Sequence, residues 1–176
     1  PAGRLPALAS RSGPVAGDQV AVTVPAVPDV VSQPGPQPMC VIGDFAWDVL
    51  IRTNSELLRG GDTFGEVMLT PGGSAANVAV WASRAGMPTR FIGKIGRDRF
   101  GQLAQEDLER EHVDAHFVET EAHLTGSVAV FVDHTGERSM VSGHGADFYL
   151  LPQELPRDII RSSRHLHLTA WSFFID

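Results

Sequence analysis

The stretch Pro71-Gly72-Gly73-Ser74-Ala75-Ala76-Asn77 decides how the rest of the chain is interpreted. Its two glycines permit a tight turn and let a ligand approach the backbone. Ser74 is in position to cap a helix that follows, and Asn77 lies one turn into that helix. Apolar residues then recur at helical spacing until Gly86 and Pro88. A glycine turn leading into a helix N-terminus favours oxygen-rich ligands, although it can also be a plain strand-to-helix connection.

The composition limits the possible classes of function. The 176 residues are 43% hydrophobic and 20% charged, which is sufficient for a folded core. A formal net charge of −7 without a basic stripe argues against nucleic-acid binding, and no apolar run is long enough to span a membrane. Cys40 is the single cysteine, so no internal disulfide can form. Its apolar neighbours predict a buried thiol, and we expect a cytoplasmic protein.

Residues 1–38 differ in composition from the rest of the chain. They hold most of the prolines and show no periodicity, which is typical of a disordered Pro/Ala-rich leader and not of a signal peptide. Met39 directly precedes the first segment with the pattern of a fold. We therefore expect residues 1–38 to be dispensable for folding.

Residues 39–176 alternate between predicted strands and helices. A buried parallel strand at Cys40–Gly43 leads to two carboxylates, Asp44 and Asp48, at the strand end where open α/β sheets bind ligands. Either aspartate could equally be a loop cap or a solvated charge. The other predicted elements are strands at 49–52, 64–69, 90–95, 115–118, 125–132, 138–142 and 165–169, and helices near 74–85, 100–111 and 156–162.

Two of the predicted strand pairs are hairpins that leave the main sheet, one before the glycine turn and one at residues 125–142, and they could form a small separate sheet. Residues 143–147 are expected to be flexible and polar. Asp98 is expected to hold its own glycine turn together. The series stops shortly after the strand at 165–169, so we expect an unfinished main sheet with exposed apolar surface and poor solubility.

The chain contains several short motifs in a fixed order along the sequence. They are Gly43–Asp48, the stretch 71–77, Gly96-x-Asp98-x-x-Gly101, Thr125-Gly126, Thr135-Gly136-Glu137-Arg138 and Gly145-Ala146. Over residues 39–176 the chain thereby resembles the amino-terminal half of PfkB, or ribokinase-like, carbohydrate kinases. The resemblance implies an α/β fold with a doubly wound sheet that is incomplete at the C-terminus. A small β-sheet lid, formed by residues 48–70 and 125–142, would accompany it. It also implies transfer of the ATP γ-phosphate, with Mg²⁺, to a hydroxymethyl group of a sugar or similar acceptor.

The resemblance further implies a set of acceptor-binding residues: Asp48, Gly72, Gly73, Asn77, Val128 and Val130. Asp48 would accept hydrogen bonds from sugar hydroxyls at the hinge, and Asn77 would bond another hydroxyl with its two-sided amide. The glycines would let backbone groups approach the sugar. The two valines would cover it with the apolar face of the lid and exclude water.

Departures from the family pattern leave the acceptor open. Ala46 stands where ribokinases have Asn, Trp47 is bulky, and the glycine turn reads Gly-Gly-Ser-Ala-Ala-Asn. Ribose, ketoses, keto-deoxy sugar acids and nucleosides all remain possible, and for an anionic acceptor Arg138 is a candidate partner, if it is not simply solvated. The family's Gly-Ala-Gly-Asp signature, which supplies the general base, does not occur. We expect no catalytic residue and no complete ATP site in this chain, and no kinase activity from it alone.

Other interpretations of the sequence are a non-catalytic truncated product or sugar-binding fragment, and an NAD-dependent dehydrogenase. The dehydrogenase is disfavoured because no glycine-rich phosphate turn follows the first strand. His165-x-His167 places two imidazoles on one strand face, but no third metal ligand is evident. The remaining histidines, at 112, 116, 123, 134 and 144, are expected at the surface. The edges of the lid could pair with a second copy to form a homodimer.

Overall fold

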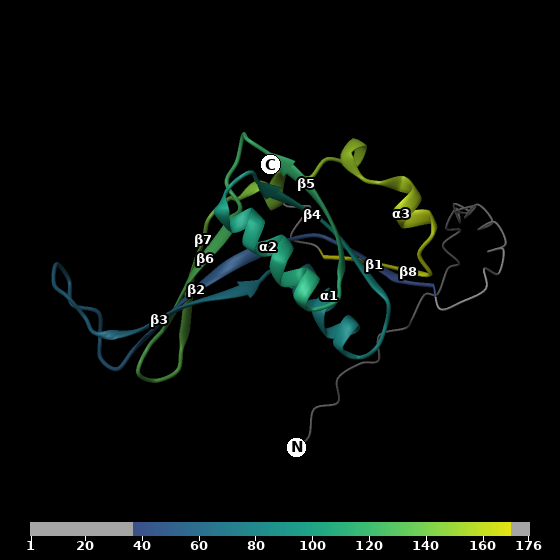
Figure 1. Cartoon of the computed structure of the whole chain (residues 1–176). Coiled ribbons are helices and arrows are strands. Elements are labelled where there is room, and N and C mark those ends of the chain that lie inside the picture. The colour runs from purple at the N-terminus through teal and green to yellow at the C-terminus, as the bar shows by residue number, and fades with distance from the viewer. Residues whose placement is uncertain (1–36, 170–176) are drawn as a thin grey trace, which may run out of the picture. The chain divides into compact units, whose positions relative to one another are not determined.

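The computed structural model describes residues 37–169 as two β-sheets, with helices against one of them (Figure 1). The core sheet has the order β5-β4-β1-β8 and is parallel throughout. Its strands are β1 (Met39–Ile42), β4 (Thr89–Gly96), β5 (Asp114–Thr120) and β8 (His165–Leu168). The predicted leader at 1–38 lies almost entirely outside the described residues and stays a prediction.

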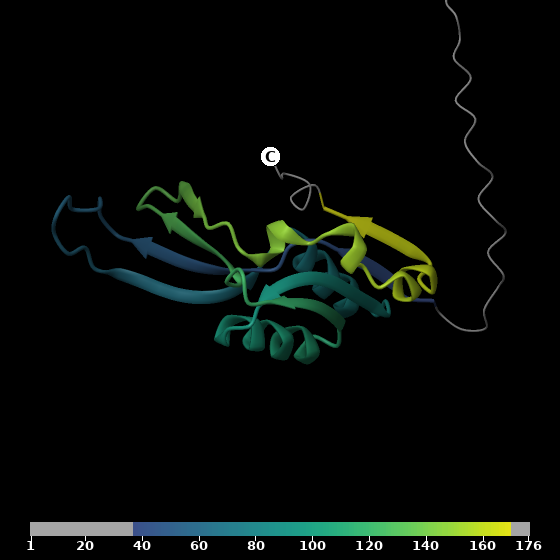
Figure 2. The same cartoon turned by 90° about the horizontal axis from the view of Figure 1, so that it is seen from above.

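One face of the core sheet is covered by α1 (Ser74–Arg84) and α2 (Arg99–Arg110). Val41 and Phe91 point to this side and are fully buried with alanines of both helices. Phe117 adds edge-to-face aromatic contact, with its ring centroid 5.4 Å from that of Phe91. Figure 2 shows α2 lying along the sheet, as its amphipathic pattern predicts.

The opposite face is covered by the segment that contains the 3-10 helices η1 (Ala146–Tyr149) and η2 (Pro152–Glu154) and the short helix α3 (Arg157–Arg161). Cys40 and Ile92 point to this side and are fully buried, so the predicted buried thiol is confirmed. Burial raises the pKa of the Cys40 thiol. Helical segments on both faces explain why the core strands are continuous apolar runs.

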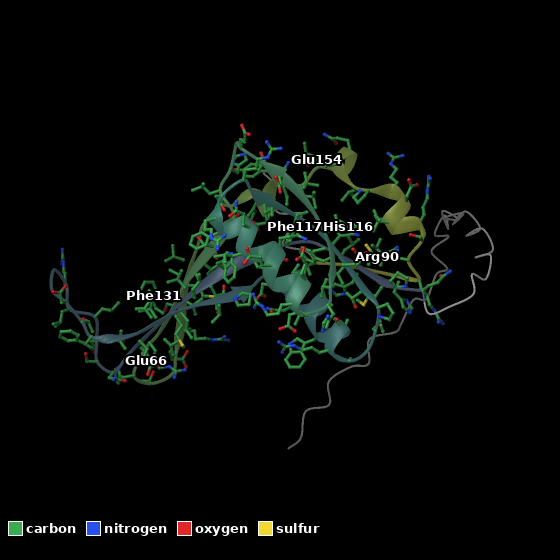
Figure 3. The ribbon with its side chains drawn as sticks, viewed as in Figure 1. Glu66, Arg90, His116, Phe117, Phe131 and Glu154 are labelled. Atoms are coloured by element: carbon green, nitrogen blue, oxygen red, sulfur yellow. The ribbon has the colours of Figure 1, made fainter. Side chains whose placement is uncertain are left out.

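Two cations tie this covering segment to the sheet. Lys94 on β4 is buried, and its Nζ donates hydrogen bonds to the Tyr149 carbonyl at 3.0 Å and to Glu154 at 2.7 Å. Arg90, on the same strand, donates to the Ile159 carbonyl at 3.2 Å (Figure 3, where Arg90 and Glu154 are labelled). A buried ammonium needs such partners, because burial without them would be costly.

The lid sheet has the order β3-β2-β6-β7. Its strands are β2 (Ala46–Thr53), β3 (Gly65–Gly72), β6 (Gly126–Val132) and β7 (Arg138–Ser142). Each of the two predicted excursions is an antiparallel hairpin, and the hairpins join through parallel pairing of β2 with β6. The predicted arrangement of a parallel core sheet with a second, small sheet is confirmed.

The prediction of a flexible, polar segment at 143–147 is wrong for residues 145–147, whereas Gly143 and His144 are exposed. Gly145, Ala146 and Asp147 are buried, and the last two begin η1. A Cβ on Gly145 would lie 2.2 Å from the Cα of Gly126, so the two glycines allow two backbones to touch. This contact places η1 beside the first residue of β6.

The predicted helices and strands otherwise occur close to their expected positions. Asp98 holds its turn as predicted: its Oδ1 accepts from the Gly101 amide at 2.8 Å, and its Oδ2 accepts from the Thr125 amide at 2.8 Å. The second bond connects α2 to the start of β6. Among residues 37–169, no helix combines the length and the apolar character that crossing a membrane requires.

Candidate functional site

The N-terminus of α1 is capped by a carboxylate from elsewhere in the chain. Asp44, in the connection between β1 and β2, accepts hydrogen bonds from the amides of Ser74 and Ala75. Its Oδ1 also accepts from the Thr169 hydroxyl at 2.9 Å. The prediction that Ser74 caps this helix is therefore wrong: the N-cap residue is Gly73, and no side chain of the turn makes the capping bond.

This arrangement also corrects the expected use of the first-turn amides. The Ala76 amide donates to the Asp44 carbonyl at 3.2 Å. With the Ser74 and Ala75 amides already bonded to the Asp44 carboxylate, the first turn has no amide left for a ligand oxygen. The helix dipole stabilises the Asp44 carboxylate instead.

The two glycines of the turn are both required by close contacts. Gly73 has φ 97°, and a Cβ there would lie 2.6 Å from the Asp44 carbonyl oxygen. A Cβ on Gly72 would lie 2.6 Å from Oδ2 of Asp48, whose carboxylate therefore lies over the Gly72 backbone. Asp48 is on β2, at the point where the chain leaves the core sheet for the lid sheet, and burial raises the pKa of its half-buried carboxyl.

A cavity of about 310 Å³ lies at this junction, and we call it the acceptor cavity. Four of the six predicted residues line it: Asp48, Gly73, Asn77 and Val128. It is closed on the lid side by Val128 and Met140 and on the core side by the first turn of α1. Its volume is in the range of small-molecule sites.

The remaining two predicted residues lie next to the acceptor cavity but do not line it. Gly72 is buried beneath Asp48 and lines a smaller cavity of about 200 Å³, which Asn77 also lines. Val130 is buried on β6, one side-chain repeat beyond Val128, and pairs with Leu50 and Met140. The acceptor-binding role of all six residues stays a prediction.

Asp147 lines the acceptor cavity and was not among the predicted residues. Only 6% of it is exposed, and its Oδ1 has no hydrogen-bond partner among residues 37–169. Burial, followed by the negative charge of Asp44, raises the pKa of Asp147 to about 7. The motif Gly145-Ala146-Asp147 is visible in the sequence, but its position beside Gly126 depends on a contact between distant segments.

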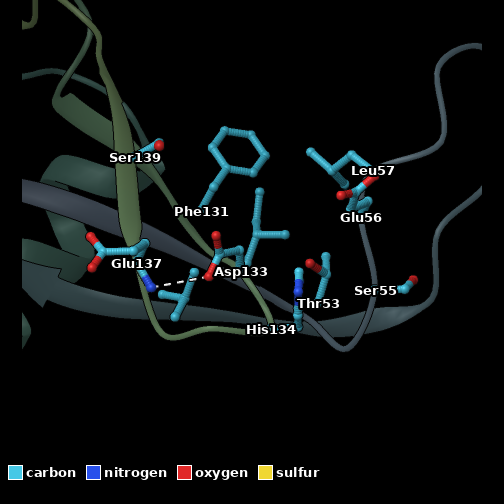
Figure 4. A pocket seen from close by; sticks show the side chains of 11 residues that line it. Thr53, Ser55, Glu56, Leu57, Phe131, Asp133, His134, Glu137 and Ser139 are labelled. Carbon is cyan, nitrogen blue, oxygen red and sulfur yellow. Dashed lines mark hydrogen bonds between the residues drawn. The ribbon is translucent and has the colours of Figure 1, made fainter.

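Another cavity, of about 390 Å³, lies at the far end of the lid sheet between its two hairpins (Figure 4). Its Asp133 is occupied by its own turn, because it accepts from the amides of Thr135 at 2.8 Å and Glu137 at 3.0 Å. None of the six predicted residues lines it. The acceptor cavity is therefore the better candidate for the functional site.

The described residues do not fit a metal centre. Nowhere between residues 37 and 169 do three His, Cys, Asp or Glu side chains converge as ligands would, and β8 carries His165 and His167 without a third partner in that range. Of the histidines expected at the surface, His112, His134 and His144 are exposed. His116 and His123 are half-buried, which corrects that prediction, and His123 stacks on Tyr149.

Comparison with known proteins identifies the family of the chain. Residues 37–176 match the pfkB family carbohydrate kinases. A fructokinase of Salmonella typhimurium is 35% identical over 120 residues, which are 66% of this chain and 36% of the fructokinase. The chain thus spans well under half the length of this relative.

Solved structures share the fold. A ribokinase from Giardia lamblia superposes with a TM-score of 0.72 at 19% identity, over 76% of this chain and 45% of the ribokinase. An uncharacterized sugar kinase from Pyrococcus horikoshii, solved in complex with ATP, gives a TM-score of 0.64 at 29% identity over 74% and 42% of the two chains. The parallel core sheet with a small second sheet places the chain in the ribokinase-like fold class. The chain belongs to the pfkB family of carbohydrate kinases.

Proposed function

We propose that this chain forms the acceptor-binding part of a kinase that transfers the γ-phosphoryl group of ATP to a hydroxymethyl group of a sugar or sugar-like acceptor. The observation that carries the proposal is the meeting of Asp48, Asn77 and Val128 in one cavity at the junction of the two sheets. Membership of the pfkB family favours a kinase over the alternative of a dehydrogenase.

The side chains of the acceptor cavity divide into polar and apolar groups with separate roles. The Asp48 carboxylate would accept hydrogen bonds from two acceptor hydroxyls, and these bonds are strong because the oxygen is charged. Asn77 is exposed and its side-chain amide makes no hydrogen bond within the described range, so that amide is free to donate and accept. Val128 would cover the acceptor and exclude water from the transfer.

ATP with Mg²⁺ would supply the phosphoryl group and its charge neutralisation. No cluster of three His, Cys, Asp or Glu side chains that could hold a metal ion occurs among residues 37–169. We propose that the chain by itself binds an acceptor without phosphorylating it. The alternative of a non-catalytic sugar-binding fragment shares this acceptor-binding step.

Binding of neutral sugars tests the proposal. Calorimetric titration of the 176-residue chain with D-fructose and D-ribose should show saturable binding of at least one of them. Asp48→Asn should weaken that binding about tenfold, because hydrogen bonds to a charged acceptor are replaced by bonds to a neutral amide. Asp62→Asn is the matched control, since Asp62 is exposed in the β2–β3 connection and lines none of the cavities described above. Absence of binding by both sugars would contradict the proposal.

A coupled assay for ADP release tests the second part. The purified chain with ATP, Mg²⁺ and either sugar should show no turnover above the rate without protein. Sugar-dependent turnover that disappears in Asp48→Asn would show that the chain is catalytic and would contradict this part alone.

We also propose that the lid sheet pairs with a second copy of the chain. Its outer strands carry exposed apolar side chains, with Val67 on β3 68% exposed and Val141 on β7 65% exposed. Association would cover this surface. Light scattering should report a dimer whose population falls in Val67→Lys, whereas a monomer at all concentrations would contradict the pairing.

A further inference from the structure

The acceptor cavity is lined by carboxylates without a compensating cation. Asp44, Asp48 and Asp147 all line it, and no lysine, arginine or histidine of the described residues does. Arg138, the candidate partner for an anionic acceptor, is exposed on β7 and does not line it. An anion entering this cavity would meet only like charges from this part of the chain.

The three carboxylates are held differently. Asp44 is satisfied by the amides of α1 and by the Thr169 hydroxyl. Asp48 is half-buried over the backbone of Gly72. Asp147 differs from both, because its buried Oδ1 has no partner between residues 37 and 169. This Oδ1 packs on backbone, because a Cβ on Gly126 would lie 2.5 Å from it. The other oxygen of the Asp147 carboxyl also makes no side-chain hydrogen bond with another residue in the described range, and Asp147 lines the cavity. Buried carboxyl groups without partners are rare, and a ligand in the cavity would supply one to the second oxygen.

We infer that Asp147 is a specificity-determining residue of the acceptor cavity, which binds a hydroxyl of an uncharged, hydroxyl-rich acceptor and disfavours acceptors that carry a carboxylate or a phosphate. A ligand hydroxyl supplies a hydrogen bond to the second oxygen of a buried carboxyl that makes none with other residues of the described range. A ligand anion, by contrast, would be repelled as soon as Asp147 is ionised. This inference rests on the proposed function and narrows its substrate class to neutral sugars.

We expect the ionisation of Asp147 to control how strongly the acceptor cavity discriminates against anions. Asp44 and Asp48 face the same cavity. On the other side of η1, the Lys94 ammonium is engaged by Glu154 at 2.7 Å, and His144 precedes η1 with its ring stacked on Phe148. Since the pKa of Asp147 is about 7, its carboxyl is mostly protonated at pH 6 and mostly ionised at pH 8. Discrimination against anions should therefore increase between these two pH values.

Paired titrations test this dependence. The dissociation constants of a neutral sugar (D-fructose or D-ribose, whichever binds more tightly) and of 2-keto-3-deoxy-D-gluconate are measured by calorimetry at pH 6 and pH 8. The anion remains ionised at both values. The ratio of its dissociation constant to that of the sugar should rise about tenfold from pH 6 to pH 8 in the wild type, because one negative charge is added near the ligand. In Asp147→Asn the ratio should stay constant within about twofold.

Asp62→Asn is the control for a lost surface charge and should behave as the wild type. If binding of the anion is too weak to measure in the wild type, that binding must become measurable in Asp147→Asn at pH 8. A wild-type ratio that does not change with pH, or an Asp147→Asn ratio that rises as steeply, would overturn the inference. In that case sugar binding that is weakened about tenfold in Asp48→Asn would still support the proposed function, whereas failure of the wild type to bind either sugar would overturn both.

Discussion

Within residues 37–169 the core sheet and the lid sheet have four strands each, but they differ in how far their side chains are buried. Cys40, Val41, Phe91 and Ile92 of the core sheet are fully buried, because helical segments cover both faces. In the lid sheet, every residue of β7 is exposed. The core sheet therefore supplies the stability of the chain, whereas the lid sheet presents surface, and the acceptor cavity lies where the two meet.

The largest difference should come from matched truncations in the two sheets. Phe91→Ala removes a fully buried ring in contact with Phe117 and should lower the free energy of unfolding by about 3–5 kcal/mol. Val67→Ala, 68% exposed on the lid sheet, should change it by less than about 0.5 kcal/mol. Urea unfolding followed by circular dichroism measures both, and equal losses would refute the division of roles.

At the junction, the charge of Asp147 should make stability depend on pH. Its pKa is about 7 in the folded protein and 3.8 in the unfolded chain. Between these two pH values the folded state holds a proton that the unfolded state has released. Stability contributed by this carboxyl is present below pH 4 and is lost as the pH rises through 7, by at most about 4 kcal/mol. Asp147→Asn should therefore be more stable than the wild type at pH 8, with the gain vanishing near pH 4. A gain that is the same at both pH values would be inconsistent with this origin.

Glycine substitutions compare the junction with the tip of the lid sheet. Gly73 and Gly136 both have positive φ, 97° and 89°, but only Gly73 is crowded. Gly73→Ala should cost about 2–3 kcal/mol, because backbone strain and the clash with the Asp44 carbonyl add together, while Gly136→Ala should cost about 1 kcal/mol. Thermal melts of both variants give the comparison. A larger loss of stability in Gly136→Ala than in Gly73→Ala would contradict this prediction.

The smallest effects should come from ion pairs. Glu154→Gln removes the charge that pairs with buried Lys94 and should cost about 1–2 kcal/mol. Glu66 pairs with Arg52 at 4.0 Å on the lid sheet with both side chains more than half exposed, so Glu66→Gln should change stability by less than about 0.5 kcal/mol. Denaturant unfolding at 0.1 M and 0.5 M salt would distinguish them, since screening affects exposed pairs more.

Local patterns predicted the elements of the fold correctly. The apolar run at Cys40–Gly43 predicted the first core strand. The alternation of apolar side chains at 125–132 predicted the first strand of the second hairpin. Asp98 was recognised as the residue that holds a turn, because its partner Gly101 is three positions away. These features were predictable because their causes lie within a few residues of one another.

What sequence reasoning missed depends on contacts between distant segments. The cap of α1 comes from Asp44, thirty positions before Ser74, and no local rule distinguishes it from the local candidate. Asp147 lies in the segment that the sequence predicts to be flexible, because the backbone contact between Gly145 and Gly126 that buries it cannot be derived from local pattern. In the candidate site, the glycine turn and Asp48 could be predicted from sequence motifs. The carboxylate of Asp147 could be placed there only once the fold was known.

The parallel pairing of β2 with β6 has a consequence for biosynthesis. Ala46 pairs with Gly126, so the hairpin of β2 and β3 leaves the ribosome long before the strand that completes its sheet. During that interval β2 has an unsatisfied edge that could pair with a neighbouring nascent chain. The order of synthesis thus makes the first hairpin the segment for which a chaperone would be most useful, until the second hairpin emerges and closes the sheet.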